Sequence, residues 1–208
     1  MRKINGNIFK AMPLLLFASA LLAGCSIIST PPPLQIVVLH SYQAEAACPD
    51  PLDVQIVIPV PHASAGLNTD RIAILLDNRQ VNYLEGYRWE NSNVSIVQRQ
   101  LVDAINSSNC FTGAGTGSMS LRADYRLELD VKLMHFTNTA DNKRQAEVDM
   151  LLRLVEVKSG RLLGQYDARA RELCGHDLFG GMEKALHLAL RDSLGWLRET
   201  VSANQPGK

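Results

Sequence analysis

Residues 125–133 read Tyr-Arg-Leu-Glu-Leu-Asp-Val-Lys-Leu, in which apolar and charged side chains alternate without a break. Successive side chains of a β-strand point to opposite faces, so this alternation predicts a strand that extends to Phe136, with one apolar and one solvated face. The apolar face would hold Tyr125, Leu127, Leu129, Val131 and Leu133, and the charged face Arg126, Glu128, Asp130 and Lys132. One buried and one wet face are typical of an antiparallel sheet.

The segments on either side predict further strands. Residues 146–157 and 161–171 are joined by Lys158-Ser159-Gly160, which suits the turn of a β-hairpin. Earlier in the chain, alternating or β-branched apolar runs predict strands at residues 34–39, 54–60, 71–76 and 80–84, with Asp77-Asn78-Arg79 as the turn between the last two.

Two segments have helical periodicity. Apolar residues recur at helical spacing over residues 94–105, and a longer apolar stripe follows Asp177, a good N-cap residue. Residues 112–120 hold glycines at alternate positions and lack the Lys-Ser/Thr of a phosphate-binding loop, so we predict a flexible loop. The expected fold class is α+β, a curved antiparallel or mixed sheet with two helices packed on it.

The N-terminus predicts a secreted, lipid-anchored protein. A basic start and an uncharged apolar run lead to Leu21-Leu22-Ala23-Gly24-Cys25, which resembles a bacterial lipobox. We therefore expect a signal peptide at residues 1–24 and acyl chains on Cys25. A plain signal peptide or a membrane helix over residues 11–28 is the alternative, but three consecutive prolines follow it closely and it barely reaches the length of a span.

Ser26, in place of an aspartate, favours the outer membrane in that lipoprotein pattern, with the protein facing the periplasm of a Gram-negative bacterium. Residues 25–33 would then be a lipidated tether and residues 34–208 one periplasmic domain, long enough for its own core. The chain has 21 basic and 21 acidic residues, which gives no electrostatic case for nucleic-acid binding.

Three cysteines follow Cys25, at positions 48, 110 and 174. An oxidising periplasm favours one disulfide and one free thiol, and the sequence leaves all three pairings open. We expect the pair Cys110–Cys174, because Cys110 follows the first helix and Cys174 precedes the last one. We expect no metal site, since Cys174 and His176 are the only close Cys/His pair.

The order of segments resembles the ABC-type transport auxiliary lipoprotein family, which includes the paraquat-inducible C-type lipoproteins. The similar segments are the lipobox, Arg71–Leu76 with Val81-Asn82-Tyr83, Trp89 before the helix, Ala123-Asp124-Tyr125-Arg126-Leu127, the hairpin at 146–163 and the final helix. The resemblance implies a fold like the N-terminal domain of TolB. It also implies partners, namely an inner-membrane ABC transporter or permease and a periplasmic protein of the mammalian-cell-entry (MCE) type.

The function we expect is a non-enzymatic accessory role in moving lipid or hydrophobic solutes between the two membranes, without a cofactor. A lipoprotein regulator of an envelope enzyme, such as a cell-wall synthase, is the alternative, and a homo-oligomer is left open. A hydrolase is disfavoured because no Gly-x-Ser-x-Gly elbow occurs. None of the histidines sits in a catalytic motif; they are His40, His62, His135, His176 and His187.

Overall fold

The strand β7 (Tyr125–Asn138) is the one on which the sheet is assembled. The computed structural model describes residues 33–44, 48–76, 80–117 and 122–205. Along one edge β7 pairs antiparallel with β8 (Arg144–Glu156), which pairs antiparallel with β9 (Leu162–Leu173). The other edge of β7 carries three short parallel strands in succession, β2 (Leu52–Ile58), β3 (His62–Ala63) and β4 (Arg71–Leu76).

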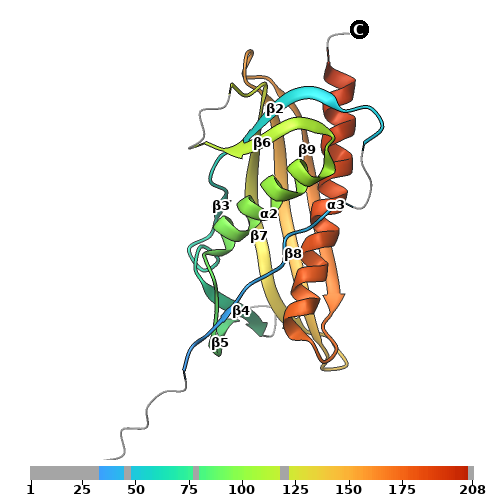
Figure 1. Ribbon diagram of the computed structural model, residues 1–208. Coiled ribbons are helices and arrows are strands. Elements are labelled where there is room, and N and C mark those ends of the chain that lie inside the picture. Colours follow the sequence, from blue (N-terminus) through green and yellow to red (C-terminus); the bar gives the residue numbers. More distant parts are fainter. Residues whose placement is uncertain (1–32, 45–47, 77–79, 118–121, 206–208) are drawn as a thin grey trace, which may run out of the picture. The chain divides into compact units, whose positions relative to one another are not determined.

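Three more strands complete a nine-strand mixed sheet (Figure 1). β5 (Gln80–Trp89) pairs antiparallel with β4, and β1 (Gln35–Val37) pairs parallel with β5. β6 (Phe111–Thr116) pairs parallel with β2. The α+β class with a mixed sheet is therefore confirmed, and the predicted turn at residues 77–79 lies outside the described residues.

Two helices cover one face of the sheet. α2 (Asn93–Ser108) begins at the N-cap Ser92, and α3 (Leu178–Asn204) begins at Asp177, whose Oδ1 accepts a hydrogen bond of 2.9 Å from the Gly180 amide. The apolar stripes of both helices are buried, and Figure 1 shows the helices running over the same side of β7, β8 and β9. Both predicted helices and the predicted N-cap of the last one are confirmed.

The core face of the sheet follows the predicted alternation up to a bulge. Leu127 opposes Leu154, Leu129 opposes Leu152, and all four side chains are buried. Between Val131 and Leu133 the register shifts, so that Met134 and Phe136 lie in the core. The prediction that Leu133 belongs to the apolar face is wrong, because a β-bulge reverses the side-chain alternation beyond it.

The predicted loop at residues 112–120 is also partly a strand. Residues 111–116 form β6, and residues 118–120 lie outside the described residues. Glycines weaken a strand in isolation, but β6 gains the hydrogen bonds of β2 along its length. The hairpin between β8 and β9 forms as predicted, with Gly160 at a φ of 71°.

The segment after β1 is tied to both helices. The side chain of Gln100 on α2 donates to the carbonyls of Leu39 and His40 at 3.2 and 2.9 Å and accepts from the Tyr42 amide at 3.0 Å. The His40 ring lies 2.8 Å from a carboxylate oxygen of Glu183 on α3. These contacts fix the start of the domain against its helical layer.

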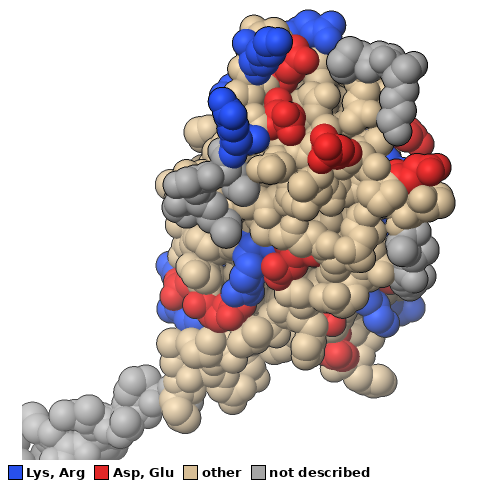
Figure 2. All heavy atoms as spheres, turned by 45° about the horizontal axis from the view of Figure 1, so that its top comes forward, with Lys and Arg blue, Asp and Glu red and all other residues tan. Residues whose placement is uncertain are grey.

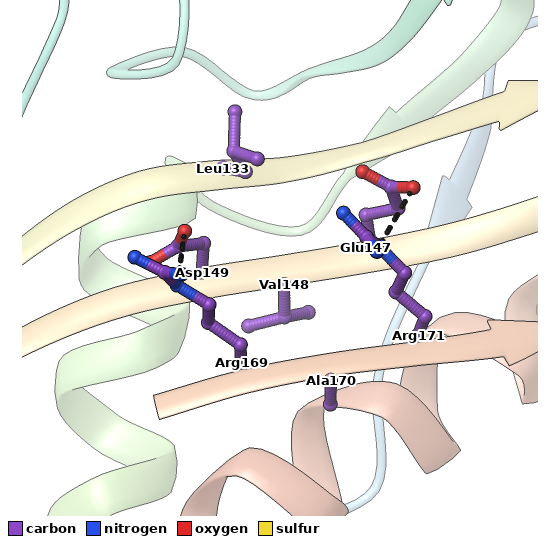
Figure 3. A pocket seen from close by; sticks show the side chains of 7 residues that line it. All are labelled: Leu133, Glu147, Val148, Asp149, Arg169, Ala170 and Arg171. Atoms are coloured by element: carbon purple, nitrogen blue, oxygen red, sulfur yellow. Dashed lines mark ion pairs between the residues drawn. The ribbon is translucent and has the colours of Figure 1, made fainter. Parts of the chain in front are cut away.

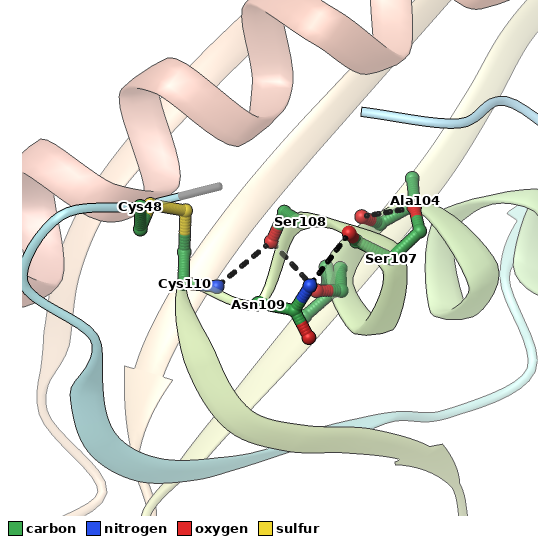
Figure 4. Close-up of a disulfide and its surroundings, with 7 residues drawn as sticks. Cys48, Ala104, Ser107, Ser108, Asn109 and Cys110 are labelled. Carbon is green, nitrogen blue, oxygen red and sulfur yellow. Dashed lines mark hydrogen bonds between the residues drawn. A yellow bond between two sulfur atoms is a disulfide. The ribbon is translucent and has the colours of Figure 1, made fainter. Parts of the chain in front are cut away.

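The disulfide joins Cys48 to Cys110, with their Cα atoms 5.0 Å apart (Figure 4). The predicted pair Cys110–Cys174 is wrong, because Cys110, the residue before β6, is bridged to Cys48 and Cys174 is left as a free thiol. The Leu52 amide donates to the Cys110 carbonyl at 2.8 Å, and this β2–β6 pairing brings residue 48 close to residue 110. Cys174 is a buried free thiol packed against Gly181 at the start of α3.

We expect Cys48→Ser to lower the free energy of unfolding by up to about 4 kcal/mol, because the bridge closes a loop with a sequence separation of 62 residues. Urea unfolding of the oxidised protein measures this difference. Cys110→Ser should give the same value, and Cys174→Ser is the control that leaves sensitivity to reductant unchanged. Recovery of a Cys110–Cys174 peptide by non-reducing mapping would contradict the assignment.

Candidate docking face on the outer side of the sheet

The face of the sheet opposite the helices carries cross-strand ion pairs between β8 and β9. The register places Glu147 opposite Arg171 and Asp149 opposite Arg169. In each pair the arginine Nε lies 3.1 Å from a carboxylate oxygen. Figure 3 shows both arginines reaching from β9 toward the acids of β8. We call these four residues, with Lys132 and Asp167, the charged outer face.

Lys132 and Asp167 extend the pairs into a ladder. The Lys132 Nζ lies 2.6 Å from Asp167, and Arg169 Nη2 lies 3.6 Å from the same carboxylate oxygen. The hydrogen bond from Lys132 lowers the pKa of Asp167 below its ordinary value. Lys132 reaches this position because it is the extra residue of the bulge in β7. Exposed ion pairs contribute little stability singly, so the ladder mainly fixes the directions of its side chains.

In the two ion pairs between β8 and β9, the acids are less accessible than the arginines. The side chains of Glu147 and Asp149 are each 16% exposed, whereas those of Arg169 and Arg171 are 66% and 70% exposed. Glu147 and Asp149 therefore lie beneath the arginines, and a partner would meet two guanidinium groups held in place beside the Asp167 side chain, which is 42% exposed. Elsewhere, on the face in Figure 2, basic and acidic side chains lie near one another between uncharged areas.

His135 is the buried titratable group next to the ladder. Its side chain is 6% exposed, and Nε2 lies 3.6 Å from Glu147 Oε2. Burial lowers the pKa of His135 below its ordinary value of 6.5, and the Glu147 carboxylate only partly offsets this effect. The imidazole is therefore neutral at neutral pH and lies beside the Glu147 carboxylate of the charged outer face.

Two hollows flank Leu133 on this side. One, of about 230 Å³, is lined by Leu133 and the four paired residues of β8 and β9. The other, of about 180 Å³, is mainly apolar and is lined by Leu67, Leu75, Val81 and Leu133, with His135 at its wall. Each is small compared with the 300–1,000 Å³ of a typical small-molecule site.

The arrangement favours docking over chemistry. Each acid of the ladder already has a basic partner, and the described residues contain no group of three or more potential metal ligands. Within the same residues no helix is long and apolar enough to cross a membrane. An outward pair of ordered arginines with an adjacent apolar hollow is typical of protein interfaces, where arginine is enriched.

The structure brings together only some of the residues that the sequence singled out. Arg126 and Glu128 form their own ion pair at 2.9 Å, and Lys132 joins the ladder. Cys25 lies outside the described residues. Glu147, Asp149, Arg169 and Arg171 were not predicted as site residues, although each stands at an outward position of its strand. The register between β8 and β9, which the alternation alone does not give, is what pairs them.

One family model matches most of the chain. The sequence model of the ABC-type transport auxiliary lipoprotein component family matches residues 38–192. No curated protein matches the chain. The crystal structure of XCC0632 from Xanthomonas campestris is similar in fold, with a TM-score of 0.75 at 15% identity, covering 82% of this chain and 98% of that one. A hypothetical protein, CT253 from Chlamydia trachomatis, aligns with a TM-score of 0.52 at 7% identity, covering 74% and 100%.

The buried His135 predicts a pH dependence of stability. Its pKa is lower in the folded than in the unfolded chain, so the unfolded state takes up the proton first as the pH falls below about 6.5. Stability is then lost on acidification, and His135→Gln should flatten this loss between pH 7.5 and 5.5. Urea unfolding across that range measures the slope. The exposed-site variant His176→Gln should keep the wild-type slope; a His135→Gln slope equal to wild type would refute the assignment.

Proposed function

Because the chain belongs to the family of ABC-type transport auxiliary lipoprotein components, we propose that it is a non-enzymatic accessory subunit. In this role it works across the periplasm with an ABC transporter of the inner membrane. Membership of a lipoprotein family makes it a lipid-anchored component of an ABC-type transport system. The finer proposal is that its partner is an MCE-type periplasmic protein and its cargo is lipid or a hydrophobic solute. The likeness to the N-terminal domain of TolB stays a prediction.

The geometry of the charged outer face supports docking as the mode of action. Arg169 and Arg171 are oriented by acids beneath them, so a partner's carboxylates would meet donors that need little reordering. Guanidinium groups bind carboxylates with two parallel hydrogen bonds, which adds geometric specificity. The adjacent apolar hollow accommodates one side chain rather than an acyl chain, which favours contact with a protein over enclosure of lipid.

We propose Cys25 as the acylated residue and the outer membrane as the destination, on the basis of the lipobox and Ser26. Cys25→Ala should leave an uncleaved precursor without palmitate, because the thiol is the attachment point. Radiolabelled palmitate and density-gradient fractionation test both parts. Ser26→Asp is the matched variant that should keep the label but move the protein to the inner membrane. Unchanged labelling of Cys25→Ala, or co-migration of wild type with inner-membrane markers, would contradict the proposal.

The partner is tested by crosslinking in cells followed by mass spectrometry. Wild type should recover an MCE-type protein or a transporter subunit. The double variant Arg169→Glu, Arg171→Glu should reduce that yield about tenfold or more, because it places five acids together on the charged outer face. Lys184→Glu, an exposed reversal on α3, is the control that should keep the wild-type yield. Recovery of only a cell-wall synthase would favour the alternative function, a lipoprotein regulator of an envelope enzyme, and would contradict the accessory role in transport.

A further inference from the structure

The first strand of the domain presents a row of exposed aliphatic side chains. Leu34, Ile36 and Val38 are 54%, 56% and 58% exposed. They occupy alternate positions, so they lie on one side of the chain, while Val37 between them is buried in the core. Among the described strands β1 pairs with β5 alone, which makes it an edge of the sheet.

Two arginines and a tyrosine border this row. The register places Arg88 beside Ile36 and Arg71 beside Arg88, so the three side chains share the outer face of the sheet. The Arg71 guanidinium lies over the Tyr83 ring, 3.5 Å from its centroid, and Arg88 Nε lies 3.9 Å from Asp70. We call these residues the β1 patch: Leu34, Ile36, Val38, Arg71, Tyr83 and Arg88.

The composition of the β1 patch is that of a membrane interface. Aliphatic side chains enter the boundary between headgroups and acyl chains, tyrosine lies at headgroup depth, and arginine binds lipid phosphates. Asp70 neutralises part of the charge on Arg88, whereas the Arg71 guanidinium rests on the Tyr83 ring and forms no ion pair with any acid of the described residues. An anionic surface therefore fits the patch better than a basic one.

The length of the preceding chain selects the lipid surface as the occupant. Residues 25–33 separate the proposed acylated cysteine from Leu34, and such a stretch spans at most about 30 Å when fully extended. The β1 patch is thus held close to the bilayer throughout. It is also held rigidly, because directly after β1 the backbone of Leu39, His40 and Tyr42 is hydrogen-bonded to Gln100, and the His40 ring contacts Glu183.

We infer that the β1 patch lies on the lipid surface that holds the acyl chains, as a second membrane contact of the domain. The aliphatic row enters the interface, and Arg71 and Arg88 face the phosphates of the headgroups. The inference rests on the proposed lipid anchor at Cys25. A second contact of this kind orients the domain, whereas an anchor on a tether alone leaves it free to rotate.

Depth-dependent quenching tests this contact on the full acylated chain in vesicles of phosphatidylethanolamine and phosphatidylglycerol. Ile36→Cys carries a bimane label, and Leu162→Cys, also about half exposed, carries it on the far hairpin as the matched control. Cys48 and Cys110 are bridged and Cys174 is buried, so the label goes to the introduced thiol. Nitroxide lipids should quench the label at position 36 at least threefold more than at position 162.

Three outcomes decide the matter. Equal quenching at both positions in a chain that floats with the vesicles overturns the β1 contact and leaves the anchor standing. A chain that does not float overturns both, because the contact rests on the anchor. The β1 contact is also overturned if unlabelled Ile36→Cys forms disulfide-linked dimers and the label at position 36 is not quenched. That result would assign the β1 edge to a second copy of the chain. In support, Arg71→Gln with Arg88→Gln should lower the quenching, while Lys158→Gln on the far hairpin should not.

Discussion

The antiparallel pairing of β7 with β8 is the interaction on which the rest of the structure depends. It runs from Tyr125 opposite Glu156 to Asn138 opposite Arg144, and its core side carries buried leucines that belong to the same hydrophobic core as the apolar stripes of both helices. Along its other edge β7 pairs in parallel with three short strands in turn, β2, β3 and β4. These parallel pairings need long connections, and α2 lies in the one that runs from β4 through β5 and β6 to β7.

The bulge at Val131–Leu133 decides which side chains of β7 reach the outer face of the sheet. Beyond it the alternation reverses, so Met134 and Phe136 fill the core while Leu133 and His135 face outward. Lys132, the extra residue, reaches Asp167 across the sheet. Bulges re-aim side chains in this way and are common near functional sites. Without the bulge, the apolar hollow beside Leu133 and the ladder beside it would not adjoin.

The sequence carries the local information for this fold and little of the long-range information. Alternation identified β7, and periodicity with an Asp177 cap identified α3, because both signals lie within one segment. The bulge, the strand β6 and the Cys48–Cys110 bridge depend on which distant segments pair. Gly113 and Gly115 predict a loop by themselves, and only β2 alongside them makes a strand. For the same reason the sequence does not predict the ion pairs of Arg169 and Arg171, because their acidic partners lie on the neighbouring strand β8.

The two surfaces share one face of one sheet, which constrains how the domain can work. The strands between them follow the order β1, β5, β4, β7, β8, β9. Neighbouring strands lie about 4.8 Å apart, so the arginines of β9 stand roughly 24 Å along the sheet from the aliphatic row of β1. With the β1 patch on the lipid, the charged outer face would keep a fixed orientation relative to the bilayer instead of turning freely on a tether. Such pre-orientation reduces the entropy lost on docking, which gives the lipid contact a part in partner binding as well as in anchoring.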